Sequence, residues 1–154
     1  MPNWKIDYTG LSRIKPLDKI FTGDELKGAG RFSANCLQTM YFQGSEKGTL
    51  KEAVLPLQAQ ISPVFAMTTF DYNGDGTQDL FLGGNINKAR LRFGKYDANR
   101  GLLLRGDGKG RFRYITQQQS GFHLAGDVRS VLSFGNSLLF GINGQPIVSY
   151  KIQR

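Results

Sequence analysis

Short runs in which apolar and polar residues alternate make up most of this chain, and glycine, asparagine and aspartate separate the runs. Alternation with a period of two is typical of β-strands with one buried face, and the separating residues favour turns. The pattern predicts strands at residues 37–43, 64–70, 79–82, 101–105, 112–116, 128–134, 138–140 and 147–152. Apolar residues at helical spacing are nearly absent, and only residues 17–29 predict one or two short helical turns, which Gly28 and Gly30 would end.

The predicted strands recur with a period near 60 residues. Three pairs of segments align: residues 42–50 with 104–112 at an offset of 62, residues 64–70 with 128–134 at an offset of 64, and residues 80–85 with 138–143 at an offset of 58. The fall from 64 to 58 means that six residues are missing from the second copy, between Phe134 and Leu138. A period near 60 with about four strands per copy is typical of β-propeller blades.

The sequence therefore predicts an all-β protein built from four-stranded antiparallel blades of the β-propeller type. Residues 1–36 are expected to form an N-terminal segment, in which Trp4, Ile6 and Tyr8 alternate like an edge strand; residues 37–100 and 101–154 form two blade-like repeats. About two and a half blades are fewer than the roughly four to eight that close a propeller. Three explanations stay open: a C-terminal piece of a longer propeller, which we favour, an oligomer that completes a ring, and an open stack stabilised by the N-terminal segment.

Residues 71–79, which join two predicted strands, form the most specific segment. The oxygen-bearing side chains Asp71, Asn73, Asp75 and Asp79 stand at positions 1, 3, 5 and 9, with the Thr77 carbonyl at position 7 as the expected backbone ligand. Gly76 permits a sharp bend, and Leu82 stands where a helical calcium loop needs a glutamate. Oxygen donors without histidine or cysteine favour Ca²⁺ over zinc or copper. One structural Ca²⁺ site is predicted; the alternative is a polar turn that binds nothing.

Residues 66–85, AMTTFDYNGDGTQDLFLGGN, resemble the FG-GAP/VCBS repeat of calcium-binding β-propellers, a group that includes integrin α-subunit heads and many bacterial surface and secreted proteins. The resemblance to bacterial ASPIC-type repeat proteins extends through residues 94–110 and 120–129, and it covers about residues 35–150. It implies that the calcium ligands are the side chains of Asp71, Asn73, Asp75 and Asp79 and the Thr77 carbonyl. The second copy departs from the pattern because Gly135 replaces the first aspartate, so we expect one such site rather than two.

The charge balance adds a question about partners. The 154 residues include 20 Lys+Arg against 12 Asp+Glu, and the whole excess falls in residues 78–154, which hold 12 basic and 4 acidic side chains. Such asymmetry can mark an anionic partner. Residues 90–93 and 111–114 alternate, however, as strands with a solvated basic face would. No nucleic-acid-binding motif accompanies them, so nucleic acid is not an expected partner.

Catalytic residues are few. His123 is the only histidine, and Asp97 with Asp127 could form an acid/base pair, but no nucleophile elbow or cysteine-flanking signature accompanies them. We expect Asp127 to bond a turn or to pair with an arginine between blades. A propeller-scaffolded hydrolase or lyase that uses His123 or Asp97 and Asp127 therefore remains one alternative, and the protein is expected not to be an enzyme. Binding of an anionic polymer by the arginine-rich second half is the other alternative.

Composition limits the setting. No apolar run approaches the roughly 20 residues that span a bilayer. Cys36 is the single cysteine, so no internal disulfide is expected, and the N-terminus lacks the pattern of a signal peptide. The expected function is a non-catalytic module that binds a protein or glycan, or acts as a scaffold, within a larger bacterial surface or secreted protein. The partners would be that ligand and the remaining blades or further copies of the chain, in an extracellular, cell-surface or periplasmic location where calcium is plentiful.

Overall fold

The structure is a computed structural model that describes residues 19–30, 32–88 and 94–152. Packing divides the chain into two units, Met1–Cys36 and Leu37–Arg154. The predicted edge strand around Trp4, Ile6 and Tyr8 lies outside the described residues, as do Arg90 and Arg92 of the basic alternating run.

The first unit forms hydrogen-bonded turns. Leu26 N donates to the Thr22 carbonyl, and Ala29 N donates to the Leu26 carbonyl. The Glu25 carboxylate accepts hydrogen bonds from both the backbone N and the hydroxyl of Thr22, at 2.8 and 2.9 Å. These turns lie where one or two helical turns are predicted, and no α-helix forms among the described residues of this unit.

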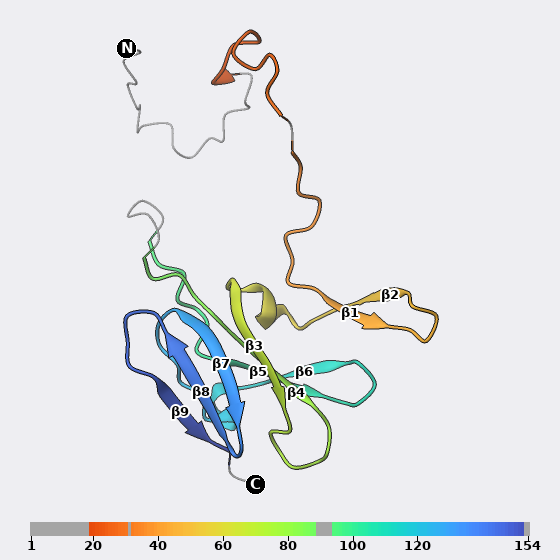
Figure 1. Cartoon of the computed structure of the whole chain (residues 1–154), viewed down its shortest axis with the longest axis vertical. Coiled ribbons are helices and arrows are strands. Elements are labelled where there is room, and N and C mark those ends of the chain that lie inside the picture. Colours follow the sequence, from red (N-terminus) through yellow and green to blue (C-terminus); the bar gives the residue numbers. More distant parts are fainter. Residues whose placement is uncertain (1–18, 31, 89–93, 153–154) are drawn as a thin grey trace. The chain divides into compact units, whose positions relative to one another are not determined.

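Within the described residues of the second unit, nine strands form three antiparallel sheets, and the strands of each sheet follow one another in the sequence (Figure 1). The first sheet contains β1 (Tyr41–Gly44) and β2 (Leu50–Ala53). The second contains β3 (Val64–Phe70), β4 (Asp79–Gly84), β5 (Leu102–Gly106) and β6 (Phe112–Ile115), and the third contains β7 (Val128–Phe134), β8 (Ser137–Ile142) and β9 (Val148–Lys151). The all-β class predicted from the sequence is confirmed.

Two short helices complete the second unit: a 3₁₀ helix, η3 (Leu57–Gln60), and α1 (Gln117–Ser120). Alternation does not predict α1, but a local signal does exist. Thr116 and Gln119 form a capping box at its start, and Gly121 ends it with a φ of 72°. The strands differ from the prediction as well: β1 begins at Tyr41 although its strand is predicted from residue 37, β2 lies where no strand is predicted, and β4 and β8 are longer than predicted.

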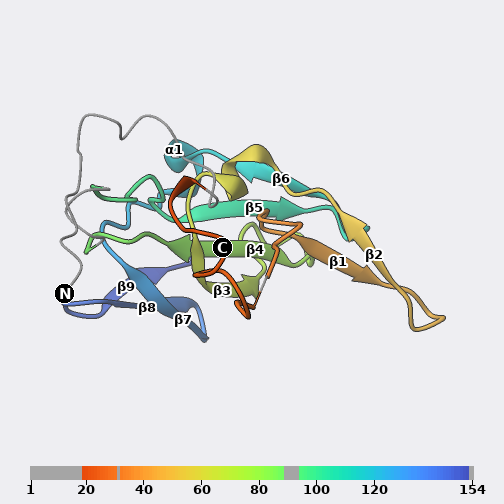
Figure 2. The same cartoon turned by 90° about the horizontal axis from the view of Figure 1, so that it is seen from above.

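The four-stranded sheet is the middle layer, with β7–β9 to its left and β1–β2 to its right in Figure 1. Figure 2 shows the same layers from above. Because both faces of the middle sheet are covered, Leu102, Leu103 and Leu104 of β5 are all buried, whereas a strand with one wet face would alternate.

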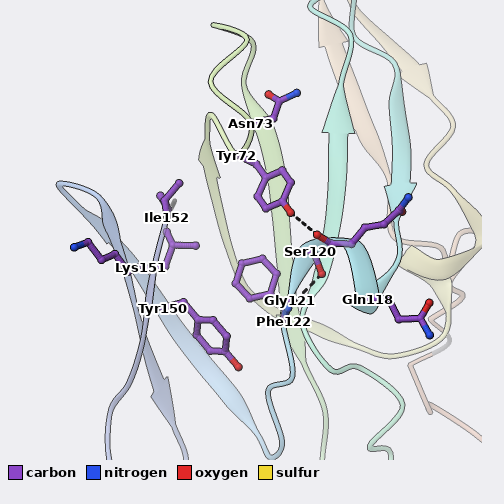
Figure 3. A pocket seen from close by; sticks show the side chains of 11 residues that line it. Tyr72, Asn73, Gln118, Ser120, Gly121, Phe122, Tyr150, Lys151 and Ile152 are labelled. Atoms are coloured by element: carbon purple, nitrogen blue, oxygen red, sulfur yellow. Dashed lines mark hydrogen bonds between the residues drawn. The ribbon is translucent and has the colours of Figure 1, made fainter. Parts of the chain in front are cut away.

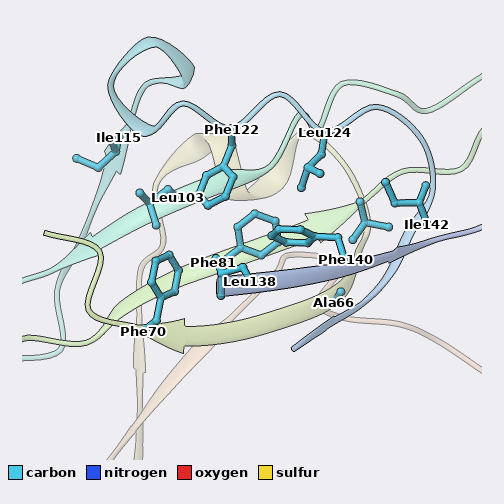
Figure 4. Close-up of a cluster of buried hydrophobic side chains, with 11 residues drawn as sticks. Ala66, Phe70, Phe81, Leu103, Ile115, Phe122, Leu124, Leu138, Phe140 and Ile142 are labelled. Carbon is cyan, nitrogen blue, oxygen red and sulfur yellow. The ribbon is translucent and has the colours of Figure 1, made fainter. Parts of the chain in front are cut away.

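Each face of the middle sheet carries its own core. The Phe81 core lies between the middle sheet and β7–β9 and consists of Ala66, Phe70, Phe81, Leu103, Ile115, Phe122, Leu124, Val128, Leu138, Phe140 and Ile142 (Figure 4). The Leu104 core on the other face consists of Leu55, Ala59, Leu82, Leu102 and Leu104. Tyr41 of β1 packs edge-to-face on Phe112 of β6, with 5.3 Å between the ring centroids, at the border of the second core.

The hairpins β3–β4 and β7–β8 have the same irregularity and different turns. The pairing register shifts between Val64 and Ala66 in the first hairpin, and between Val128 and Ser130 in the second. At the turn, Phe70 pairs with Asp79 across residues 71–78, whereas Phe134 pairs with Ser137 across residues 135 and 136 only. The six residues by which the sequence offsets differ all lie in this turn.

The sheets and the sequence repeats are out of phase. Residues 37–100 contain β1 to β4, and residues 101–154 contain β5 to β9. Hydrogen bonds join β4 to β5, so the middle sheet takes two strands from each repeat.

Candidate metal centre

Asp79 anchors the turn that carries the predicted calcium ligands. It is the first residue of β4 and is completely buried. Its Oδ2 accepts a hydrogen bond from Tyr72 N at 2.8 Å, and its Oδ1 accepts one from Gly106 N at 2.9 Å. One carboxylate therefore fastens the start of the turn and the end of β5 to the same point.

Asp71 folds the first half of the turn around its own side chain. Its Oδ1 accepts hydrogen bonds from Gly74 N at 2.8 Å and Asp75 N at 3.2 Å, and its Oδ2 accepts one from Gly76 N at 2.9 Å. Gly74 and Gly76 have φ values of 75° and 79°, in the left-handed region that glycine adopts without strain. The sharp bend predicted at Gly76 is present.

Asp75 is held by three different groups. Its Oδ1 accepts a hydrogen bond from Thr77 N at 2.9 Å, and its Oδ2 accepts one from Asn73 Nδ2 at 2.8 Å. The same Oδ2 forms an ion pair with the Arg105 guanidinium at 2.7 Å. The Asn73 amide, the Arg105 guanidinium and the Thr77 N–H together hold the pKa of the Asp75 carboxyl well below its usual range.

The turn holds oxygen donors that suit a hard cation, and these oxygens accept hydrogen bonds from N–H groups of the turn and from Arg105. All the predicted ligand positions, Asp71, Asn73, Asp75, Thr77 and Asp79, lie in the turn or at its end. A carboxylate oxygen has two lone pairs, and each Asp79 oxygen uses one to accept a hydrogen bond from a backbone N–H. The second lone pair of each oxygen remains for a metal ion. Among the described His, Cys, Asp and Glu side chains, however, no group of three is placed to hold a metal ion. Arg105 supplies the positive charge at Asp75 instead.

Sequence reasoning does not find Arg105 as a partner of the turn. It lies 30 residues from Asp75, and only the pairing of β4 with β5 brings the two side chains together. The motif that marks the turn is local, so it carries no signal for a contact made across a sheet.

Gly106 is the point at which the turn rests on β5. A Cβ at Gly106 would overlap the Gln78 carbonyl oxygen. Gly106→Ala is therefore expected to displace the turn and to lower the free energy of unfolding by about 1–3 kcal/mol. Gly44→Ala is the matched control, because Gly44 aligns with Gly106 and a Cβ there meets nothing within 4 Å. Urea unfolding measures both variants, and equal effects would contradict the expectation.

A cleft of about 540 Å³ lies beside the turn, between α1 and β9 (Figure 3). Its lining includes the aromatic rings of Tyr72, Phe122 and Tyr150 and the amide side chains of Asn73 and Gln118. The Tyr72 hydroxyl donates a hydrogen bond to the carbonyl of Gln119 in α1 at 2.5 Å, and this bond holds the tyrosine ring beside the helix. Phe122 is buried in the Phe81 core, so the two tyrosines and the amide side chains are the groups that a ligand could contact.

The three residues of the catalytic alternative differ in exposure. His123 and Asp97 are exposed, and Asp127 is buried. Asp127 bonds a turn, as expected, because its Oδ1 accepts from Asn87 N at 2.6 Å. Its Oδ2 pairs with Arg129 at 3.4 Å, but that arginine is only two residues along the chain, so this is a local pair and not one between blades. No hydrogen bond or ion pair among the described residues joins His123, Asp97 and Asp127.

The side chains of Asn85 and Asn99 form a buried hydrogen-bond network next to Asp127, and the sequence pattern does not predict it. Asn85 has a φ of 93°, and its side chain donates to the carbonyls of Asn99 and Gly126 at 2.6 and 3.0 Å. Its Oδ1 accepts from Asn99 N at 2.9 Å. Asn99 in turn donates to the Leu82 carbonyl at 3.3 Å and accepts from Gly101 N at 2.8 Å. The network joins the end of β4 to the start of the third sheet.

No protein-family model matches this chain, and no curated protein or solved structure matches it. The FG-GAP/VCBS resemblance therefore stays a prediction. In the part of the chain that the structure describes, no helix is long and apolar enough to cross a membrane.

Proposed function

We propose that this protein is a non-catalytic, calcium-stabilised binding or scaffolding module built from β-propeller-type blades. The observation that carries the proposal is the difference between two hairpins of the same register. β7–β8 closes with Gly135 and Asn136, whereas β3–β4 uses residues 71–78 to join strands that pair in the same way. Closing a longer turn costs more conformational entropy, and Asp71 and Asp75 within the turn and Asp79 at its end repel one another, so the extra residues serve more than connection.

Calcium would be held by the side chains of Asp71, Asn73, Asp75 and Asp79 and by the Thr77 carbonyl. The bound ion would offset most of the charge of the three carboxylates and fix the turn, so that its binding energy adds to folding stability. Asp79 and Asp71 already order the backbone of the turn through N–H groups of Tyr72, Gly74 and Gly76.

The layered sheets support the propeller-type interpretation. The four-stranded and three-stranded sheets are sequential antiparallel meanders, and side chains pack on both faces of the middle sheet, as they do in a blade between two neighbours. The aromatic and amide lining of the cleft between α1 and β9 supports a role in binding a protein or glycan. An extracellular or cell-surface setting supplies the calcium that a site with few carboxylates needs.

The proposal is tested by calcium titration of the whole chain. Free Ca²⁺ at 100 times Kd adds about 2.7 kcal/mol to the free energy of unfolding. For a protein of this size, the melting temperature should rise by about 5–10 °C, and EDTA should reverse the rise. Calorimetry should detect one bound ion per chain. A melting curve that neither Ca²⁺ nor EDTA moves would overturn the calcium proposal.

Two matched variants separate ion binding from general charge effects. Asp75→Asn removes a proposed ligand, so the calcium-dependent rise should disappear. Asp107→Asn makes the same charge change in the neighbouring hairpin, where Asp107 also accepts backbone N–H groups and pairs with an arginine. It should retain the full calcium response.

A further inference from the structure

Three arginines share one face at the end of the middle sheet. Arg105 of β5 stands directly opposite Arg113 of β6, and Arg111 lies two residues before Arg113, on the same side of the strand. All three line a cleft of about 420 Å³, together with Asp75, Thr77 and Asp107. This cleft, the arginine cleft, is separate from the one beside α1.

The arginine cleft has more positive charge than its own carboxylates neutralise. Arg105 pairs with Asp75 at 2.7 Å, and Arg111 pairs with Asp107 at 2.6 Å. The Arg113 side chain forms no hydrogen bond or ion pair with any other described residue. Like charges directly opposite each other on paired strands repel. An anion placed between Arg105 and Arg113 would relieve that repulsion.

The paired arginines still have donors to offer. Arg105 uses one terminal nitrogen for Asp75, and Arg111 uses Nε for Asp107. Each guanidinium has five N–H groups, so most of them remain for a ligand. The Arg111 side chain is 80% exposed and that of Arg105 is 41% exposed, so a ligand can reach both from solvent.

The carboxylates of the cleft set its net charge. The backbone N–H groups of Arg111 and Lys109, and then the Arg111 side chain, lower the pKa of Asp107 to about 2. Asp107 therefore stays ionised at neutral pH and leaves the cleft with one net positive charge, carried by Arg113. Planar guanidinium groups bind carboxylate, sulfate and phosphate oxygens through paired hydrogen bonds.

The neighbouring side chains distinguish a polysaccharide from a nucleic acid. Proteins that bind single-stranded nucleic acid combine basic grooves with aromatic rings on which bases stack. Phe112 is the one aromatic residue in the lining of the arginine cleft, and its ring packs edge-to-face on Tyr41 and against the Leu104 core. The lining therefore offers no series of rings on which successive bases could stack.

We propose that Arg105, Arg111 and Arg113 bind the carboxylate or sulfate groups of an acidic polysaccharide. The inference rests on the proposed binding role and gives it a ligand class, but it does not depend on calcium at residues 71–79. Failure of the calcium titration would leave it standing, and failure of polysaccharide binding would leave the calcium site standing.

Fluorescence anisotropy with the whole chain tests the site. The probes are labelled heparin, labelled polygalacturonate and a labelled single-stranded DNA of similar length, each measured between 50 and 200 mM salt. We expect one of the polysaccharides to bind more tightly than DNA, with an affinity that falls as salt rises. Heparin and polygalacturonate distinguish sulfate from carboxylate as the preferred group, and either result supports the proposal.

Matched variants locate the binding. Arg113→Ala should weaken polysaccharide binding about 10-fold and Arg113→Glu by more, because each removes a charge-assisted contact. Both should keep the wild-type melting temperature. Arg100→Ala makes the same charge change at an exposed position outside the cleft, and it should bind as the wild type does. Binding of neither polysaccharide, tighter binding of DNA, or equal losses in Arg113→Ala and Arg100→Ala would each overturn the proposal.

Discussion

Phe81→Ala is expected to lower the free energy of unfolding by about 3–5 kcal/mol, the largest effect of any single substitution proposed for this chain. Phe81 is completely buried and lies where the middle and third sheets meet (Figure 4). Its ring centroid is 5.1 Å from that of Phe122 and 5.0 Å from that of Phe140. Truncation therefore removes a large apolar side chain and both ring contacts, and it leaves a cavity between the sheets.

Urea unfolding followed by circular dichroism measures this loss. The control is Phe134→Ala on β7, where the phenylalanine is 73% exposed and its removal should change stability by less than about 0.5 kcal/mol. A loss below about 1 kcal/mol for Phe81→Ala would mean that the two sheets do not share a packed core.

Asn85→Ala is expected to destabilise the protein by about 2–4 kcal/mol, although it removes only a small polar side chain. The Asn85 amide satisfies the carbonyls of Asn99 and Gly126 and the backbone N of Asn99, all in a buried setting. Alanine would leave those groups without partners, and it would have to adopt a φ of 93°.

Two variants separate the amide from the backbone conformation. Asn85→Gly adopts the positive φ freely but lacks the amide, so it should remain destabilised. Asn143→Ala changes the aligned asparagine of the second copy, which is exposed, and it should be nearly neutral. If Asn85→Gly were as stable as the wild type, backbone strain rather than the amide network would explain the loss.

The sequence pattern predicts the strands because alternation depends only on neighbours along the chain. The bounds of β3 and β7 agree with the prediction at both ends, and the six-residue difference between the hairpins is located correctly. The run Leu102–Leu104 does not alternate, because covers on both faces of the middle sheet bury every residue. A run of consecutive apolar residues therefore indicates a strand with both faces buried, but it does not indicate which segments of the chain cover those faces.

The predicted calcium ligands all lie in one turn or at its end, and their close spacing in the sequence is sufficient to predict this. Three features of the sites do not follow from it. Arg105 reaches Asp75 through strand pairing, Gly106 supports the turn across the sheet, and Asn85 binds groups 14 and 41 residues away. Each is a long-range contact, and a single sequence carries no periodic signal for such contacts.

Asp75 belongs to both proposed sites, and this makes them thermodynamically linked. Its Oδ2 is engaged by Arg105, whose guanidinium also lines the arginine cleft. A cation that recruits Asp75 would release Arg105 for an anion, and an anion that recruits Arg105 would release Asp75 for a cation. Linkage is reciprocal, so each ligand would raise the affinity of the other by the same factor. One exposed ion pair would thus make two oppositely charged ligands bind cooperatively, with no movement of the sheets.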